Sequence, residues 1–203
     1  MIATRTLLLS IIVGVAASAA ANPLPVFGWE DCGATVLGLD GPGIEPILAA
    51  RVTAPDPVYD GNYSLRLAHN APGATPRATI AYVYGLSPDA QVHIEIVRFD
   101  AEPAGGSCRI RGRYLADDSD AGGPEDPVGT GWQWIVHTWQ MTADYSELAI
   151  DVEMIGDAGD TVWLDGMIVF PVGSNGELVT PCWDHWFVPV EGSTLSAVKD
   201  LFR

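Results

Sequence analysis

Hydrophobic and polar residues alternate with a period of two in many short segments of this chain, which is the pattern of strands that bury one face. The clearest segments are residues 63–67, 78–84, 92–96, 108–114, 148–154 and 162–165. Turn-forming runs of Gly, Pro, Asn and Asp separate them, as at 60–62 and 156–160. No long internal segment repeats its apolar positions with the period of a helix. The pattern predicts an all-β chain, an antiparallel jelly-roll β-sandwich of about nine or ten strands.

The two ends of the chain do not follow this pattern. Arg5, the apolar run at 7–15 and the alanine-rich residues 16–21 are the three parts of a secretory signal peptide. The run is too short to span a bilayer, which takes about 20 apolar residues; an uncleaved N-terminal anchor is the alternative. The predicted organisation is a signal peptide at 1–21, a β-sandwich domain at 22–171, and a C-terminal extension at 172–203 with an aromatic patch and a short helix at 193–203. The mature chain is then secreted, extracellular or periplasmic, with no transmembrane segment.

The composition is strongly acidic. Ten Lys and Arg residues stand against 26 Asp and Glu residues, which gives a formal net charge of −16. This charge argues against nucleic-acid binding, because docking on phosphates requires a clustered basic surface. The 48% of hydrophobic residues excludes a disordered acidic tail.

Three cysteines, Cys32, Cys108 and Cys182, follow the signal segment. In an exported protein one disulfide is expected among them, and their spacing leaves all three pairings open. No two cysteines have the C-x-x-C spacing and the histidines are scattered, so no zinc site is predicted.

Five short motifs resemble those of a known family. They are F-G-W-E-D at 27–31, D-G-N-Y-S-L-R-L at 60–67, G-L-S-P-D at 85–89, G-W at 131–132 and V-W-L-D-G-M-I-V at 162–169. In order and spacing they resemble the jelly-roll carbohydrate-binding modules and galactose-binding-like domains of secreted bacterial proteins, where the third motif is a G-L-x-P-G turn. The resemblance implies a non-catalytic protein that binds a glycan or a cell-surface polysaccharide.

The same resemblance implies one structural Ca²⁺ ion. It places side-chain oxygens of Glu30 and Asp165 on the ion, with backbone carbonyl oxygens around Asp60 to Asn62. Calcium takes six to eight oxygen ligands and accepts carbonyls beside one or two carboxylates. The alternative is that Asp165 caps a turn or pairs with an arginine such as Arg66.

The family's sugar site lies on the exposed face of the concave sheet or on loops at its edge. If Val92, Ile94 and Ile96 point inward, the residues between them point outward. With strand 108–114 and the strand around Ile135 taken as the next neighbours, one outward face collects six candidate ligand-binding residues: His93, Glu95, Arg109, Arg111, Arg113 and Trp134. Arginine forks suit carboxylates and an aromatic ring suits a sugar, so an acidic glycan is one candidate ligand. The alternative is ion pairing of the arginines with Glu95 and loop aspartates.

The seven tryptophans divide into two groups. Core packing is predicted for Trp29, Trp132, Trp139 and Trp163. The candidates for exposed contacts are Trp134, Trp183 and Trp186, and the alternative for the last two is that they anchor the C-terminal helix to the sandwich.

Catalysis is not predicted. The acidic loop at 116–129 has no EF-hand spacing and is interpreted as a solvated hairpin tip. The chain has no G-x-S-x-G elbow and no H-E-x-x-H motif. Two alternatives to glycan binding stay open: a structural or adhesion module of the cell surface or matrix, and a less favoured polysaccharide-acting enzyme with two carboxylates about 5–10 Å apart.

Overall fold

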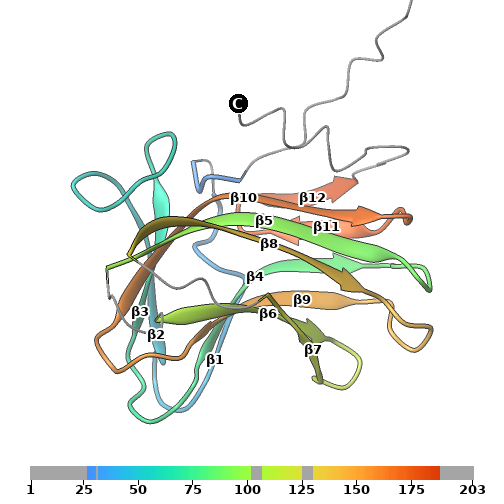
Figure 1. Ribbon diagram of the computed structural model, residues 1–203, viewed down its shortest axis with the longest axis horizontal. Coiled ribbons are helices and arrows are strands. Elements are labelled where there is room, and N and C mark those ends of the chain that lie inside the picture. The colour runs from blue at the N-terminus through green and yellow to red at the C-terminus, as the bar shows by residue number, and fades with distance from the viewer. Residues whose placement is uncertain (1–26, 31, 102–106, 125–129, 188–203) are drawn as a thin grey trace, which may run out of the picture. The chain divides into compact units, whose positions relative to one another are not determined.

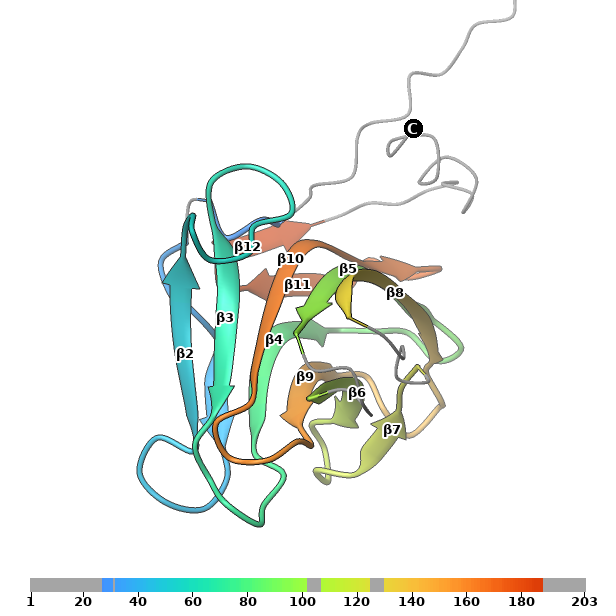
Figure 2. The same ribbon diagram turned by 60° about the vertical axis from the view of Figure 1, so that its left-hand side comes forward.

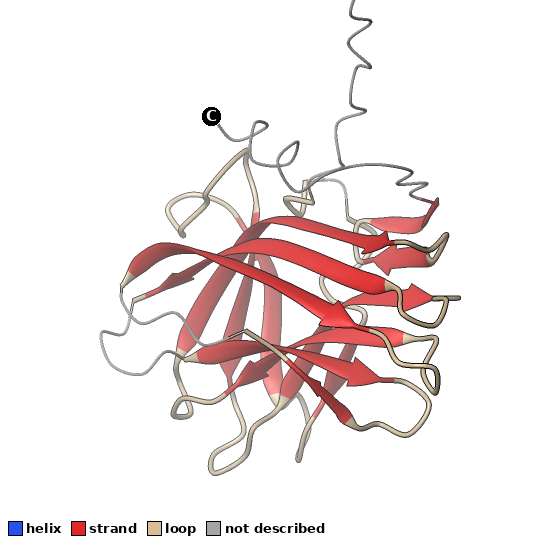
Figure 3. Ribbon diagram, turned by 45° about the vertical axis from the view of Figure 1, so that its right-hand side comes forward, coloured by secondary structure: helices blue, strands red, loops and turns tan. Residues whose placement is uncertain are grey.

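The strands of this chain form two antiparallel sheets that pack face to face (Figure 1). The structure is a computed structural model that describes residues 27–30, 32–101, 107–124 and 130–187. These residues contain twelve strands and no helix (Figure 3). The predicted all-β jelly-roll sandwich is confirmed, with more strands than the nine or ten expected.

One sheet has five strands in the order β2-β3-β10-β5-β8. Its strands are β2 (Ile47–Val52), β3 (Ser64–His69), β5 (Gln91–Asp100), β8 (Gly131–Gln140) and β10 (Thr161–Val172). Figure 2 shows β2, β3 and β10 side by side, with β5 and β8 continuing the same curved layer. The central strand β10 pairs with β3 on one edge and with β5 on the other.

The other sheet has seven strands, with the order β12-β11-β4-β9-β6-β7 and β1 paired to β4. Its strands are β1 (Gly38–Asp40), β4 (Arg77–Tyr84), β6 (Cys108–Tyr114), β7 (Asp120–Gly122), β9 (Leu148–Met154), β11 (Glu177–Thr180) and β12 (Trp183–Phe187). β1 pairs with the first part of β4 and β11 with its last part.

The hydrophobic core lies between the two sheets and follows the alternation seen in the sequence. In β5, Val92, Ile94 and Ile96 are buried there, as predicted. Alternate residues of β9, from Leu148 to Met154, are buried in the same core. Burying one such side chain stabilises the fold by about 1.5–3 kcal/mol. A one-residue slip of a strand would expose its whole apolar set, so this burial fixes which face of each strand turns outward.

The strands beyond the expected number are short. β1 and β7 have three residues each and β11 has four, which is too few for an alternation pattern to stand out. β11 and β12 come from the segment predicted as a C-terminal extension, and they continue the seven-stranded sheet through β4.

One disulfide joins Cys32 to Cys182 across 150 residues of sequence. The backbone N–H of Ala34 also donates to the carbonyl of Pro181 (3.2 Å) beside it. Cys108 is buried in β6 and lies outside this bond. The fold therefore selects one of the three pairings that the sequence left open.

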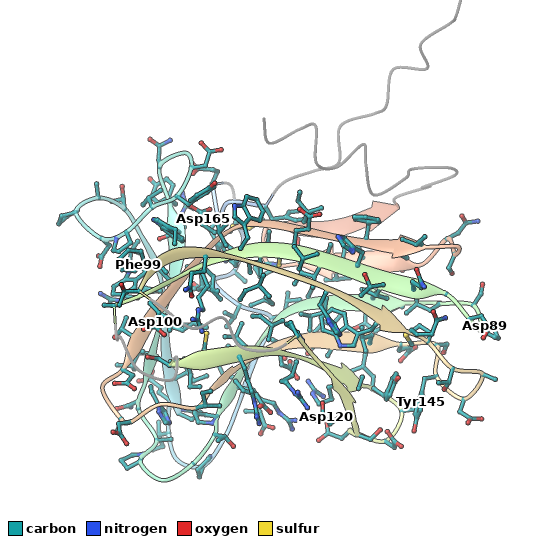
Figure 4. The ribbon with its side chains drawn as sticks, in the orientation of Figure 1. Asp89, Phe99, Asp100, Asp120, Tyr145 and Asp165 are labelled. Carbon is teal, nitrogen blue, oxygen red and sulfur yellow. A yellow bond between two sulfur atoms is a disulfide. The ribbon has the colours of Figure 1, made fainter. Side chains whose placement is uncertain are left out.

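The G-L-S-P-D motif forms the turn that leads into β5. Leu86 is buried, and Asp89 has a φ of 65° at the position where the family's motif has glycine. Glycine adopts this left-handed conformation without strain and aspartate tolerates it, so the turn survives the replacement. Figure 4 labels Asp89 at the tip of this turn.

Several predictions fall outside the described residues. They concern the signal peptide at 1–21, the helix at 193–203 and the side chains of Trp183 and Trp186. The described residues belong to one unit, Leu24–Ser193. Within them, no helix is long and apolar enough to cross a membrane.

Candidate functional site

The outer face of the five-stranded sheet carries a row of four large side chains and one alanine. The register aligns one residue from each strand across the sheet: Ala50 of β2, Arg66 of β3, Trp163 of β10, Phe99 of β5 and Trp132 of β8. Val162 and Leu164, on either side of Trp163, are buried in the core. Because successive side chains of a strand point to opposite faces, the row points away from the core.

Five rings make up this surface, which we call the aromatic face: Tyr59, Phe99, Trp132, Trp134 and Trp163. The ring centroid of Phe99 lies 5.6 Å from that of Trp163 and 5.4 Å from that of Trp132. Tyr59, in the loop between β2 and β3, lies 5.4 Å from Trp132 and 5.9 Å from Trp134. All four contacts are edge-to-face, which is a favourable arrangement of aromatic rings.

Tyr59 and Trp134 present this face to solvent. Their side chains are 44% and 40% exposed, and their ring planes meet at 86°. Two exposed rings at right angles make a corner in which one ring can stack on a ligand while the other borders it.

A buried carboxylate holds the loop that carries Tyr59. Oδ2 of Asp165 accepts the backbone N–H groups of Tyr59 (2.9 Å) and Asp60 (3.1 Å). Its Oδ1 accepts the N–H of Gly166 (2.8 Å), where a β-bulge follows in β10. Burial raises the pKa of Asp165, and the three N–H donors oppose that rise. Asp165 therefore caps a turn, one of the alternatives that the sequence left open; Figure 4 shows it near Phe99.

A second carboxylate holds the next residues of the same loop. Oε1 of Glu30 accepts the backbone N–H groups of Asn62 (2.6 Å) and Tyr63 (3.0 Å), and Oε2 accepts Nδ2 of Asn62 (3.3 Å). Gly61 has a φ of 72°, and a Cβ at this position would overlap Oε1 of Glu30. The loop is thus tied by backbone N–H groups on both sides of Gly61.

Acid should remove the contribution of Glu30 to stability. Burial alone would raise the pKa of Glu30, but the N–H donors of Asn62 and Tyr63 outweigh it and hold the pKa below its ordinary value of 4.5. Such a carboxyl stabilises the fold above its unfolded pKa, and the contribution is lost as pH falls through the folded pKa. We expect Glu30→Gln to melt below the wild type at about pH 7, and the difference to shrink as the pH falls through the folded pKa of Glu30. Melting curves over a descending pH series measure this, and a constant difference would contradict it.

The four residues predicted as calcium ligands lie around this loop. All four carboxylate oxygens of Glu30 and Asp165 accept N–H bonds, and the amide of Asn62 donates to Glu30. Calcium needs oxygen ligands, whereas here the carboxylate oxygens already accept hydrogen bonds from N–H groups. Within the described residues, no three His, Cys, Asp or Glu side chains are grouped to hold a metal ion. The N–H groups around the two carboxylates fit a capped loop. Calcium binding at Glu30, Asp165, Asp60 and Asn62 stays a prediction.

His93 and Glu95 lie on the same outer face as Trp134, as the alternation predicts. Both are buried, at 2% and 8% exposure, and they contact each other through His93 Nε2 and Glu95 Oε1 (3.2 Å). The other ring nitrogen of His93 is 2.9 Å from the hydroxyl oxygen of Thr138. Both ring nitrogens of His93 and one carboxylate oxygen of Glu95 are thus engaged within the protein.

The predicted arginine row lies on the other sheet. β6 pairs with β9 and β7, and β5 pairs with β10 and β8. The prediction that Arg109, Arg111 and Arg113 share a face with His93, Glu95 and Trp134 is wrong, because the chain crosses to the other sheet between β5 and β6. Figure 4 places Phe99 and Asp120, a neighbour of the arginines, on different sheets.

Each of these arginines pairs with a carboxylate. The ion pairs are Arg109–Glu153 (2.6 Å), Arg111–Asp120, Arg113–Asp151 (2.6 Å) and Arg113–Asp118 (2.7 Å). The hydrogen bond to Asp151 raises the pKa of Arg113 further above its ordinary value. Ion pairing of the arginines, the alternative to ligand binding, is therefore observed. The partners are Asp118 and Asp120 of the predicted acidic loop and Asp151 and Glu153 of β9, and Glu95 takes no part.

Arg113→Ala should be the more damaging of two matched substitutions in this row. Asp151 is buried at 1% exposure, so the loss of Arg113 leaves a buried carboxylate without its ion-pair partner. We expect Arg113→Ala to lower the free energy of unfolding by about 3 kcal/mol. Arg111→Ala should lower it by less than about 1 kcal/mol, because its partner Asp120 is exposed. Urea denaturation measures both, and equal losses would contradict the assignment.

Two tryptophans predicted as core residues belong to the aromatic face. Trp29 and Trp139 are buried in the core, as predicted. Trp132 and Trp163 are half-buried on the outer face, so their assignment to the core is wrong. The sequence analysis also missed Tyr59, because a loop residue carries no periodicity signal.

Comparison with protein-family models and with curated protein sequences gives no match. Among solved structures, the C-terminal family 22 carbohydrate-binding module of Clostridium thermocellum Xyn10B is similar, with a TM-score of 0.52 and 14% identity over 74% of this chain and 93% of that chain. The CBM22-1 xylan-binding domain of Paenibacillus barcinonensis Xyn10C gives 0.50 and 16% over 75% and 98%. This chain has the jelly-roll fold of these modules.

A third similar structure belongs to an enzyme. The enzymatically active domain of tailspike protein 4 from bacteriophage CBA120 gives a TM-score of 0.50 and 11% identity, over 66% of this chain. The present chain spans only 19% of that chain. At these identities the likeness concerns the fold, and it agrees with the resemblance that the sequence motifs carry.

Proposed function

We propose that this protein is a secreted, non-catalytic glycan-binding protein whose binding surface is the aromatic face. The observation that carries the proposal is the exposed ring corner of Tyr59 and Trp134, backed by Trp132, Phe99 and Trp163. A sugar ring has an apolar face of C–H groups that packs on an aromatic ring, while its hydroxyls need polar neighbours. The xylan-binding domain of similar fold makes xylan the first ligand to test.

The contacts of the carboxylates on this face support a non-catalytic role. Glycoside hydrolysis by the usual mechanism needs two carboxyl groups placed on either side of the scissile bond. Asp165 is buried under three backbone N–H donors, and Glu95 is buried against His93. Both carboxylates are engaged within the protein, so on this face they are poor candidates for an acid–base pair.

A binding and turnover screen tests the proposal. The full chain is run in affinity gels that contain xylan, galactan, mannan, cellulose derivatives or pectin, and the same mixtures are assayed for newly released reducing ends. We expect retardation by at least one polysaccharide without release of product. Release of product would show an enzyme, and retardation by none would favour the structural or adhesion alternative.

Secretion and calcium binding belong to the same proposal. Export of the full chain by a bacterial host, with a mature N-terminus near residue 22, would support the signal peptide at 1–21. A melting temperature that rises with Ca²⁺ and falls with a chelator would support the metal, because a ligand of the native state must stabilise it. Intracellular retention would oppose the signal peptide, and an unchanged melting temperature would oppose calcium binding.

A further inference from the structure

Arg66 lies in the same row across the sheet as three rings of the aromatic face, next to Trp163. In β3 it is directly opposite Trp163 of β10 and Ala50 of β2. Directly opposite residues of antiparallel strands have Cβ atoms about 4.5–5.5 Å apart. The guanidinium group of Arg66 therefore belongs to the same surface as the rings.

Arg66 differs from the other arginines of the described residues in its surroundings. Five of them form ion pairs with carboxylates: Arg77, Arg98, Arg109, Arg111 and Arg113. Arg51 lies over the ring of Tyr63, 3.7 Å from its centroid. Arg66 makes neither kind of contact with the described residues, and its Nε is buried without a hydrogen-bond partner. In a chain with a net charge of −16, carboxylates are abundant, yet none of the described ones is placed on this cation.

Trp163, on the neighbouring strand, also has a buried donor without a hydrogen-bond partner in the described part of the chain. The indole N–H of Trp163 is buried and has no hydrogen-bond acceptor among the described residues. A buried donor without an acceptor destabilises a protein, so native structures rarely keep one without a reason. Here two such donors stand on adjacent strands at the same level of the sheet, beside an aromatic surface. Both lack an acceptor, and one of them carries a positive charge.

We propose that Arg66 and Trp163 recognise the carboxylate of an acidic glycan, a polysaccharide that contains uronic acid. The planar guanidinium fork matches the planar carboxylate and can form two parallel hydrogen bonds with it. The rings of the aromatic face then hold the sugar that carries the carboxylate, so this inference rests on the proposed glycan binding. It assigns the acidic ligand to Arg66, since the arginines at 109–113 already have carboxylate partners.

The probes are matched pairs of polysaccharides that differ in the acidic group alone. Polygalacturonate and glucuronoxylan are each compared with their carboxyl-reduced forms, and chondroitin sulfate is compared with its desulfated form. Isothermal titration with the full chain should give about 10- to 100-fold tighter binding to a uronate polysaccharide than to its reduced form, at low salt. Equal binding to the two forms would overturn the inference while leaving glycan binding intact. Binding that follows the sulfate would overturn the choice of carboxylate.

Substitutions test whether Arg66 is responsible for the preference for the acidic form. Arg66→Gln should lose the preference for the acidic form and keep its affinity for the reduced form, and Trp163→Phe should lose part of the preference because it keeps a ring without the N–H. Arg109→Gln is the matched control on the other sheet and should behave as the wild type. If Arg109→Gln loses the preference and Arg66→Gln keeps it, the assignment to Arg66 is wrong. If no polysaccharide binds at all, the proposed function fails and the inference falls with it.

Stability gives a readout that does not depend on the ligand. Because Arg66 has no partner within the described residues, Arg66→Gln should fold with an unchanged or higher melting temperature. A marked fall would assign Arg66 a structural role and overturn the proposal.

Discussion

Replacing Asp165 with alanine should lower the melting temperature by about 6–12 °C and release the loop that carries Tyr59. The carboxylate accepts three backbone N–H groups in a site without solvent. Its loss leaves these donors unsatisfied, which should cost about 3 kcal/mol of unfolding free energy. Asp165→Asn should lose nearly as much, because an amide turns one N–H group toward donors that need an acceptor. Thermal denaturation followed by circular dichroism measures both variants.

Asp60→Ala is the matched control for this experiment. Asp60 is an exposed residue of the same loop, and its side chain accepts no hydrogen bond from the described residues, so its removal should leave the melting temperature within about 1 °C. The pair also separates capping from a general effect of substitutions in this loop, because the N–H groups of Tyr59 and Asp60 are held by the Asp165 side chain and not by that of Asp60. Equal losses in Asp60→Ala and Asp165→Ala would contradict the capping role.

Replacing Tyr59 or Trp134 with alanine should weaken glycan binding by at least about 30-fold, or 2 kcal/mol. These two rings expose more of their surface than the rings behind them, so they carry the stacking contact with the sugar. Asp165→Ala should weaken binding as well, since it displaces the Tyr59 ring from Trp132 and Trp134. Isothermal titration with a polysaccharide found to bind measures these losses.

Two controls separate stacking from general surface effects. Val136→Ala removes an exposed side chain from the same strand as Trp134, and Tyr84→Ala removes a half-buried ring from the other sheet. Both variants should bind within about twofold of the wild type, since neither side chain belongs to the aromatic face. Losses as large as that of Trp134→Ala would show that the rings have no special role.

The alternation of apolar residues was sufficient to predict strands and their faces. In β5 it placed Ile94 inward and Glu95 outward, and the structure agrees. The same rule indicates an outward position for Trp163, because it stands between the buried residues Val162 and Leu164. The interpretation of Trp163 as a core residue is at odds with this alternation, which was the better guide.

Sheet partners could not be predicted from local pattern. β5 and β6 follow each other in the sequence, so a hairpin was the natural expectation, but each finds its partners in a different sheet. Which strand lies next to which depends on contacts between distant residues, such as those of β10 with β3 and β5. The predicted set of six binding residues was divided by this one error, with Trp134 kept on the aromatic face and the arginines placed elsewhere.

The position of Tyr59 depends on contacts that are also distant in sequence. Its backbone is held by Asp165, 106 residues further along the chain, and the next residues are held by Glu30. The motifs at 27–31 and 162–169 contain both carboxylates, which the resemblance assigned to calcium. In the structure they serve to fix the loop from which one ring of the aromatic face projects.

The location of the binding surface is tested most directly by isothermal titration, in which one glycan found to bind the wild type is titrated into each of two double variants. Tyr59→Ala/Trp134→Ala removes the exposed rings of the five-stranded sheet, and Arg109→Ala/Arg111→Ala alters the outer face of the other sheet. We expect the first variant to lose measurable binding and the second to bind as the wild type, with both folded by circular dichroism. Binding retained by the first variant and lost by the second would contradict the assignment of the aromatic face.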